Sequence, residues 1–529
     1  MNKWRAAILI VVAALAAWLV LRSCLPEKPA TVTAAKPVRE EFHASKPLRV
    51  VVLSPTHAAD QAATTTDTKE RTNEWLEREL RYLLIRGRMR VAPMGTRSDA
   101  DAGVHSNTHA NSQGNLPSGT QPAAPFTLQI ELPADGQSTA KATLLAPDAT
   151  VSRETAIAVN SKDRLALVQS IARQLPEFLG AVQSTADWGS YIGVDDPVLY
   201  ENFIRSASEL LGSHGQGFTQ PAAADRSRAV QRLESLARKL PQSARVWSLL
   251  SLGYLSLGGQ DQASLAHIAE SRAERALELD PAQADARSAL GLVRLRRGEW
   301  AAAMEYFNAA LALDANAVSA LEGSACLLID VGHAHAALPI AQRAVALQPA
   351  NAGASACLVY AQLATDTAVD KIETSQLSST RIKALATVLS GDPASAQREI
   401  QEAKDDRANT WMEPLLLAAS DRHRRSEAMR AITLAASSGA IDASTEILSG
   451  AALRQADFVF NRMLRLGKQN QPVPLRILWL PHAAFLRTNR SFEDIVSAAG
   501  LLPFWQDHGT PDVCAKEPQV YGCKLGKGP

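Results

Sequence analysis

The chain of 529 residues has almost no net charge, because its 55 lysines and arginines balance 54 acidic residues and leave +1. It therefore lacks a basic block that would neutralise a run of phosphates, and we expect no nucleic-acid binding. Aromatic residues are also scarce, at 5%, whereas apolar residues make up 46%, with Ala and Leu dominant. That composition is typical of stacked helices that contact each other through small side chains.

Motifs of common enzymes are missing as well. The sequence contains no Gly-rich loop followed by Lys and Ser or Thr, no His-Glu-x-x-His and no Gly-x-Ser-x-Gly. His105 and His109, with Asp99 or Asp101, could supply metal ligands, but they lie in a low-complexity stretch that would be costly to order. We therefore expect a protein that is not an enzyme and that holds no metal and no cofactor.

One long apolar run stands at the start of the chain, from Ala6 to Leu21, directly after Lys3 and Arg5. It is slightly short for a bilayer, but the flanking basic residues and tryptophans suit a membrane interface. We predict that residues 1–23 form a transmembrane helix with a cytoplasmic N-terminus, so that the rest of the chain is exported. A cleaved signal peptide and a lipoprotein signal remain alternatives.

Cysteines are few, with five in the whole chain. Cys514 and Cys523 bracket a short Pro-containing loop near the C-terminus, a spacing that a disulfide closes easily. Export would make this disulfide possible. Cys326 and Cys357 lie in Ala- and Leu-rich helical patterns, and we expect them to be buried, unreactive thiols.

After the predicted anchor we predict a linker over residues 24–46 and then an α+β domain over residues 47–183. Residues 95–125 are rich in Ser, Asn, Gly, Gln and Pro and predict a disordered insertion in this domain. Alternating and β-branched runs predict its strands, and apolar residues at helical spacing predict its helices. The predicted strands are 46–55, 88–93, 126–132, 140–145 and 155–159, and the predicted helices are 67–86 and 163–182.

Residues 184–470 predict an all-α solenoid, with a 34-residue period that is clearest over 246–351. Leu290 and Gly291 would let two helices approach closely, Gly298 would form the turn, and Phe307 would pack one helix on the other. We expect His333 and His335 to be solvated turn residues. Helices are predicted before the first clear repeat and after the last, at 197–211, 225–240, 378–389, 393–404, 411–419, 427–437 and 443–466.

Residues 471–529 are unusually aromatic and predict a cap that covers the apolar face of the last repeat. The aromatic residues of this segment are Trp479, Phe485, Phe492, Phe504 and Trp505.

The whole arrangement resembles a known family. Residues 49–55 and 88–93 are similar to the first two strands of TolB-like (FlgO-like) domains, which precede tetratricopeptide (TPR) arrays in many bacterial proteins. Residues 478–514 resemble the terminal segment of the extracytoplasmic part of CadC-type membrane regulators. Those regulators carry a winged-helix DNA-binding domain before the membrane segment, whereas five residues precede the apolar run here. The resemblance therefore implies a TolB-like domain and TPR repeats, but not direct transcriptional control.

In a TPR unit the first helix lines a concave groove that binds partners. The residues at the corresponding positions give an apolar, weakly acidic groove without the Lys and Asn that clamp a C-terminal carboxylate. They could equally pack against neighbouring helices or the first domain. The predicted groove residues are Trp247, Leu250, Tyr254, Asp285, Ser288, Leu292, Leu295, Ser319 and Glu322.

These features together predict a single-pass protein of the bacterial inner membrane whose bulk is periplasmic. The first hypothesis is a non-catalytic TPR scaffold that binds a protein or peptide partner of the cell envelope. The alternative is a sensory module of a membrane signalling complex, in which the α+β domain or its junction with the solenoid binds a small molecule. The sequence does not identify the partner.

Overall fold

The structure is a computed structural model in which most of the chain can be described. The described residues are 48–53, 66–89, 91, 125–133, 138–180, 188–211, 223–257, 262–349, 351–365, 388, 396, 406–469 and 471–524. All of them belong to one compact unit, His43–Pro529. The predicted anchor 1–23, the linker 24–46 and nearly all of the insertion 95–125 lie outside them. In the described part of the chain, no helix combines the length and apolar character needed to cross a membrane.

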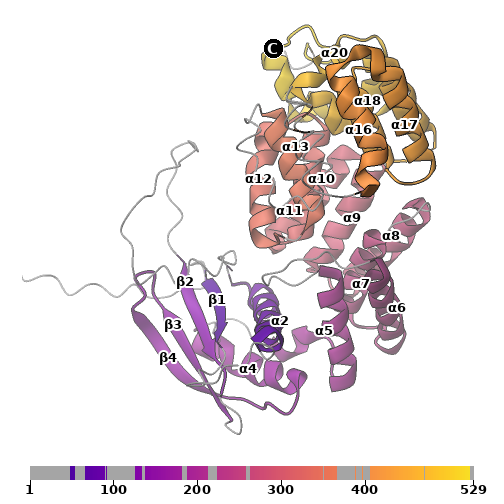
Figure 1. Cartoon of the computed structure of the whole chain (residues 1–529). Coiled ribbons are helices and arrows are strands. Elements are labelled where there is room, and N and C mark those ends of the chain that lie inside the picture. Colours follow the sequence, from indigo (N-terminus) through magenta and orange to yellow (C-terminus); the bar gives the residue numbers. More distant parts are fainter. Residues whose placement is uncertain are drawn as a thin grey trace, which may run out of the picture. The chain divides into compact units, whose positions relative to one another are not determined.

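A four-stranded mixed sheet lies at the N-terminal side of the described chain (Figure 1). Its strands follow the order β1-β2-β3-β4, with β1 parallel to β2 and the other pairs antiparallel. In register, Leu48 faces Phe126 and Ile130 faces Ala142. Three predicted strands are therefore confirmed, and the last one begins earlier than predicted. The strands are β1 (Leu48–Leu53), β2 (Phe126–Glu131), β3 (Thr139–Leu145) and β4 (Val151–Ala158).

Two helices pack on this sheet, α2 (Thr66–Arg86) against β1 and α4 (Arg164–Phe178) against β4. Helix α4 begins where the Asp163 side chain accepts a hydrogen bond from the Ala166 amide at 2.8 Å. Such an N-cap satisfies an amide that has no partner within the helix. The apolar faces predicted for both helices are buried, as the period of 3.6 residues requires.

The predicted strand 88–93 appears only as an isolated parallel bridge between Val91 and Leu48. Arg88 has a left-handed backbone with φ of 60°, which a strand does not tolerate. Residues 90, 92 and 93 lie outside the described residues, so the prediction for them stays open.

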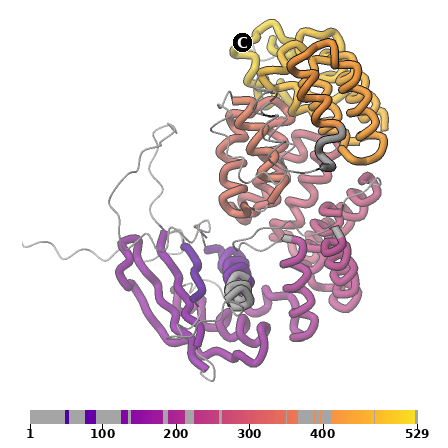
Figure 2. Tube along the Cα trace, viewed as in Figure 1, coloured from indigo at the N-terminus to yellow at the C-terminus, as the bar shows by residue number. Residues whose placement is uncertain are grey.

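Antiparallel helix pairs follow the sheet and lie side by side in chain order (Figure 2). Helices α9, α11 and α13 begin at residues 284, 318 and 352, that is, 34 residues apart each time. The regular spacing confirms the predicted helical repeats at this coarse level. The helices are α5 (Pro197–Leu211), α6 (Ala223–Lys239), α7 (Ala244–Ser256), α8 (Gln262–Leu279), α9 (Ala284–Arg296), α10 (Trp300–Leu313), α11 (Val318–Asp330), α12 (Ala334–Leu347) and α13 (Ala352–Ala364).

Glycines permit the close packing within a pair. A Cβ atom at Gly291 would lie 2.5 Å from Cε1 of Phe307, so α9 and α10 approach as predicted only because this position has no side chain. Phe307 is fully buried between them. Gly298 forms the turn in the left-handed region with φ of 72°, where glycine carries no steric penalty.

The single helix predicted at 443–466 is wrong. The chain forms two helices, α18 (Ala443–Ala452) and α19 (Ala456–Lys468), because Arg454 adopts a left-handed backbone with φ of 57°. Arg454 stands two residues after its helix, as Gly298 and Gly332 do after theirs. An arginine therefore occupies a turn position that the sequence pattern marks with glycine elsewhere.

Helices α16 (Asp406–Ser420) and α17 (Arg425–Ser437) match the predicted helices 411–419 and 427–437. The helices predicted at 378–389 and 393–404 lie outside the described residues except for Val388 and Ala396.

The C-terminal segment is compact and rests on two separate parts of the repeats. Its helices are η5 (Leu475–Trp479), η6 (Pro481–Ala483), α20 (Ala484–Arg487), α21 (Ser491–Ala498), α22 (Leu501–His508) and η7 (Asp512–Ala515). Helix α21 contacts α19, as a cap on the last repeat should. The indole nitrogens of Trp479 and Trp505 also donate to the carbonyls of Asp330 and Val331, at 2.8 and 2.9 Å. The cap therefore closes the end of α11 as well as the last repeat.

His333 and His335 contact this cap rather than solvent alone. His333 Nε2 lies 3.0 Å from the Gly509 carbonyl oxygen, and His335 Nδ1 lies 2.9 Å from the Asp512 carboxylate. The His335 side chain stays largely exposed beside that contact.

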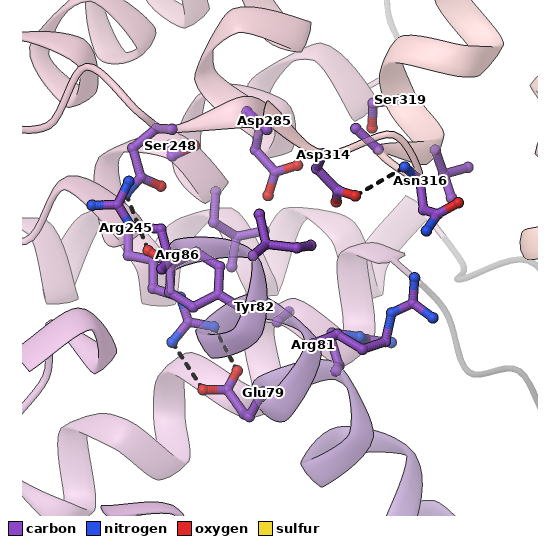
Figure 3. Close-up of a pocket in the computed structure, with 18 of the residues that line it drawn as sticks. Glu79, Arg81, Tyr82, Arg86, Arg245, Ser248, Asp285, Asp314, Asn316 and Ser319 are labelled. Carbon is purple, nitrogen blue, oxygen red and sulfur yellow. Dashed lines mark hydrogen bonds and ion pairs between the residues drawn. The ribbon is translucent and has the colours of Figure 1, made fainter. Parts of the chain in front are cut away.

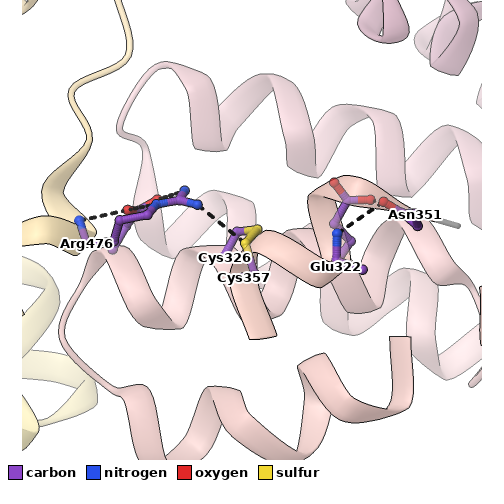
Figure 4. Close-up of a disulfide and its surroundings, with 7 residues drawn as sticks. Glu322, Cys326, Asn351, Cys357 and Arg476 are labelled. Carbon is purple, nitrogen blue, oxygen red and sulfur yellow. Dashed lines mark hydrogen bonds and ion pairs between the residues drawn. A yellow bond between two sulfur atoms is a disulfide. The ribbon is translucent and has the colours of Figure 1, made fainter. Parts of the chain in front are cut away.

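Two disulfides are present. Cys514 and Cys523 are joined as predicted, with their Cα atoms 5.3 Å apart. The prediction of free thiols at Cys326 and Cys357 is wrong, because these residues also form a disulfide, with Cα atoms 5.4 Å apart (Figure 4). They lie on α11 and α13, which are equivalent helices of successive repeats and stack directly on each other. The two cysteines are 31 residues apart in the sequence, and only the stacking of the repeats brings them together, so the sequence did not predict this disulfide.

Candidate functional site: a cavity at the junction of helix α2 and the repeats

A cavity of about 240 Å³ lies where α2 of the α+β part meets the helical repeats (Figure 3). Helix α2 forms one wall. The opposite wall consists of α5 and the N-terminal ends of α7, α9 and α11, the first helices of three successive repeats. Because these ends are displayed together by the stacking, the repeats create a site that no single repeat has.

A buried ion pair joins α2 to α7 at one side of the cavity. Arg245 donates two hydrogen bonds to the Glu79 carboxylate, at 2.5 and 2.9 Å, and Tyr200 donates a third at 2.9 Å. The Arg245 guanidinium also lies over the Tyr82 ring, 4.0 Å from its centroid. Burial alone would lower the pKa of Arg245, but the adjacent Glu79 carboxylate outweighs this effect and raises it. The pair is fully compensated and is a structural link.

Further contacts hold α2 to the turn before α9. Arg86 forms an ion pair with Asp280 at 2.8 Å and donates to the Ala282 carbonyl at 3.1 Å. Gln283 donates to the Tyr82 hydroxyl at 3.1 Å. These bonds between distant parts of the chain fix the cavity walls against each other.

Asn316, in the turn before α11, closes the site on its other side. Its side-chain amide donates to the Val91 carbonyl at 3.1 Å, and its oxygen accepts from Arg343 at 2.8 Å. Asn316 is thus fully engaged, and it ties the α+β part to a third repeat.

Arg81 differs from the other arginines of these walls. Its side chain extends from α2 toward the turn that holds Asp314 and Asn316 (Figure 3), and only 9% of the residue is exposed. Among the described residues it has no hydrogen-bond or ion-pair partner within bonding distance. Burial lowers the pKa of Arg81, and Asp314 and Glu77 act in the opposite direction. A buried cation without a direct partner is unfavourable for folding alone.

Two carboxylates face the cavity from the opposite wall. Asp285, at the start of α9, lines the cavity and is exposed there. Burial and the neighbouring Asp314 raise the pKa of Asp285 to about 6. Burial also raises the pKa of Asp314, although its side chain accepts a hydrogen bond from the Asn316 amide at 2.9 Å. The two acids therefore repel each other in a site of restricted hydration.

Three hydrogen-bonding atoms of the lining are also unsatisfied. Ser248 Oγ, Trp75 Nε1 and Arg86 Nε are buried and have no hydrogen-bond partner in the part of the chain that the structure describes. Unpaired buried polar groups are rare in folded proteins, and several at one place indicate a site that something else completes. The cavity therefore combines room, unpaired donors and acidic acceptors.

The nine predicted groove residues do not gather in one place. Asp285 and Ser319 line the cavity. Leu250, Tyr254 and Ser288 are buried, and the Tyr254 hydroxyl donates to Glu234. Leu292 and Leu295 are partly buried against the apolar core of the later repeats.

The remaining two, Trp247 and Glu322, are engaged with their neighbours. The Trp247 indole donates to the Pro241 carbonyl at 3.0 Å, and Arg272 lies over its ring. Glu322 accepts from Asn351 at 2.8 Å (Figure 4), and burial raises its pKa. Most of this set thus packs against neighbouring helices.

The sequence interpretation missed the α2 wall. It considered only the apolar stripe of α2 and counted Trp75 within it. Trp75 also starts a second, mixed stripe at helical spacing, which continues with Glu79, Tyr82 and Arg86. An aromatic and charged stripe on a helix that already has an apolar face indicates a second interface, and this signal was available in the sequence.

Among the residues that the structure describes, no group of three or more His, Cys, Asp or Glu side chains is placed to hold a metal ion. His105 and His109 lie outside them. Comparison of the chain with models of protein families finds no match, and comparison with curated proteins finds none either.

Proposed function

We propose that the chain is an exported, non-catalytic binding protein that takes a small molecule into the junction cavity, as the sensory module of a membrane complex would. The observation that carries this proposal is the cavity of about 240 Å³ with the buried and directly unpaired Arg81 in its wall. A ligand would supply what folding leaves unsatisfied. The cavity also spans two parts of the molecule, so that its occupancy couples α2 to three repeats.

The proposed identity of the parts follows the resemblance in the sequence. The helix pairs at 34-residue spacing support TPR repeats, and the β1-α2-β2 arrangement with its antiparallel extension supports a TolB-like domain. Two disulfides support an oxidising compartment, in line with an N-terminal anchor and a periplasmic location.

Thermal unfolding in the presence of a library of charged and neutral metabolites tests the proposal. A ligand that binds only the folded state raises the midpoint in proportion to its saturation. Ala284→Phe fills the cavity from the start of α9, and Ala301→Phe places the same side chain on the exposed face of α10 as a matched control. We expect at least one metabolite to stabilise the parent and the Ala301→Phe variant but not Ala284→Phe. Equal stabilisation of all three chains, or of none, would refute a small-molecule site here.

A scaffold for a protein or peptide partner is the second candidate. It is favoured by Asp285 and Ser319, two predicted groove residues that line the cavity, and by Trp247, which stays partly exposed. Affinity purification from detergent-solubilised membranes, followed by mass spectrometry, tests it. We expect Trp247→Ala to lose a recurrent partner without a change in thermal midpoint. Retention of the partner, or a lowered midpoint, would assign Trp247 to packing instead.

A further inference from the structure

We propose that the junction cavity binds a small zwitterion, with the ligand's carboxylate against Arg81 and its ammonium group between Asp285 and Asp314. This inference rests on the proposed function, because it names the chemical class of the ligand for the same site. It is drawn from the placement of three charged side chains around one cavity (Figure 3).

The anionic half of the ligand is indicated by the donors of the site. Arg81 is nine-tenths buried and keeps its guanidinium donors unused among the described residues. A guanidinium binds a carboxylate through two parallel hydrogen bonds, which Lys does not match in geometry. Helices α7, α9 and α11 all begin at the cavity, and their N-terminal ends add positive potential.

The cationic half is indicated by the acids on the opposite wall. Asp285 has no hydrogen-bond or ion-pair partner within the described part of the chain, and Asp314 stands close enough to repel it. An ammonium group between them would remove the repulsion and satisfy both carboxylates. The other acid of the lining, Glu79, is already occupied by Arg245 and Tyr200, so it does not compete for the ligand.

Ligands with one kind of charge fit less well. An amine without a carboxylate would leave Arg81 uncompensated and add a second cation beside it. A carboxylate without an amine would bring a third negative charge toward the two acids. Such juxtapositions of like charges are unfavourable, because a cavity walled by protein screens charges less than bulk water does. A zwitterion alone satisfies both walls.

The volume of the cavity fits a ligand with a short carbon chain. A dry cavity of about 150 Å³ accommodates benzene, so the present cavity has room for about ten heavy atoms. ω-Amino acids from glycine to 6-aminohexanoate fall within that limit and vary the distance between the two charges. They therefore measure the spacing that the site prefers.

Titration calorimetry of the full-length chain with this series, with butanoate and with 1-aminobutane tests the inference. We expect one chain length to bind best, and to bind at least tenfold more tightly than either singly charged compound. Arg81→Met should weaken that compound at least tenfold and leave 1-aminobutane unchanged or bound more tightly. Asp285→Asn should weaken it similarly and leave butanoate unchanged or bound more tightly. Asp195→Asn, at an exposed position, is the matched control.

The outcomes separate the two proposals. Equal binding of a singly charged compound and the zwitterions, or insensitivity to Arg81→Met, would overturn the zwitterion assignment while leaving a small-molecule site intact. If no ω-amino acid binds but a metabolite from the library still stabilises the chain in the cavity-dependent manner, the ligand class named here is wrong. Loss of every cavity-dependent effect would remove the proposed function itself.

Discussion

Two arginines, the buried Arg81 and the largely buried Arg476, face aspartates in this molecule, and their surroundings differ. Arg476 of the cap donates two side-chain hydrogen bonds to Asp330, at 2.7 and 2.9 Å, and its backbone amide adds a third at 3.1 Å. It also lies over the Tyr360 ring. Burial alone would lower the pKa of Arg476, but Asp330 outweighs this effect and raises it. Arg81, by contrast, has Asp314 nearby but no bond to it among the described residues.

The difference separates a structural ion pair from the proposed binding site. A charge that is buried with all its hydrogen bonds made contributes to a unique fold, whereas a charge buried without them opposes folding. Residues of the second kind persist where they are used for function. The predictions below act on this contrast.

Among the single substitutions, the largest loss of stability should follow Asp330→Leu. Removal of one partner leaves the largely buried Arg476 guanidinium uncompensated, which would cost about 3 to 5 kcal/mol if it were fully buried and about 2 to 3 kcal/mol with its remaining exposure. Urea unfolding measures the change. The double variant Asp330→Leu/Arg476→Met removes both charges and should recover most of it. A double variant as unstable as the single one would show that Asp330 acts through something other than this pair.

The disulfide beside Arg476 should stabilise more than the terminal one. By loop-closure entropy, a bridge over 31 residues contributes about 3.7 kcal/mol, and a bridge over 9 residues about 2.6 kcal/mol. The variants Cys326→Ala/Cys357→Ala and Cys514→Ala/Cys523→Ala, compared by urea unfolding, measure both. Alkylation without reductant, followed by mass spectrometry, should label none of the four cysteines in the parent. Labelling of Cys326 and Cys357 would restore the thiol interpretation.

Arg81→Met should change the stability of the fold in the opposite direction to Asp330→Leu. It removes a buried cation that has no direct partner and keeps most of the apolar stem, so stability should be unchanged or higher by about 1 kcal/mol. Arg476→Met is the comparison, because there the loss leaves the buried Asp330 carboxylate without its cation and with only the backbone amide of residue 476. If Arg81→Met destabilised the chain as strongly as Arg476→Met, the contrast between the two arginines would be void.

Asp285→Asn should produce the smallest effect, and one that depends on pH. The folded chain holds a proton on Asp285 up to about pH 6, whereas an unfolded chain loses it near pH 4. The parent therefore loses stability as pH rises from about 4 to about 6, and the penalty is complete above that window. Asp285 is exposed, so solvent screens its carboxyl, and we expect the variant to be more stable at pH 7.5 by about 1 kcal/mol or less.

The difference in stability between the parent and the Asp285→Asn variant should vanish near pH 4, where Asp285 is protonated in both the folded and the unfolded chain. Groups that face this carboxyl are Asp314, Arg245 and Arg78. Thermal unfolding from pH 4 to pH 7.5 measures the trend, and a gain that is constant across the range would exclude Asp285 as its source.

Local periodicity was enough to predict most elements. The faces of α2 and α4 and the turn at Gly298 follow from spacing alone, since each depends on residues within one or two helical turns. The sequence did not predict the helix break at Arg454, because an arginine occupies a turn position where other repeats have glycine. The Cys326–Cys357 disulfide and the cavity were not predicted, because both depend on how the repeats stack, and local spacing does not show this.

The same limit explains the fate of the predicted groove. Residues such as Leu250 and Tyr254 were placed by their position in a repeat, but their burial depends on the neighbouring helices. Asp285 and Ser319 line the cavity because they lie at the starts of helices that face α2. Position within a repeat predicts which face a residue occupies, and not what lies over that face.

The way in which the cap closes α11 has a consequence for biosynthesis. Trp479 and Trp505 bond the carbonyls of residues 330 and 331, and Asp512 donates to Gly332 from almost the end of the described chain. A nascent chain that has just emerged as far as α13 still lacks the residues that cover its central repeats. Those repeats must wait for about 150 further residues, roughly 8 to 30 seconds of elongation. A chain terminated prematurely would therefore expose its middle, and not merely its end, to proteases and chaperones.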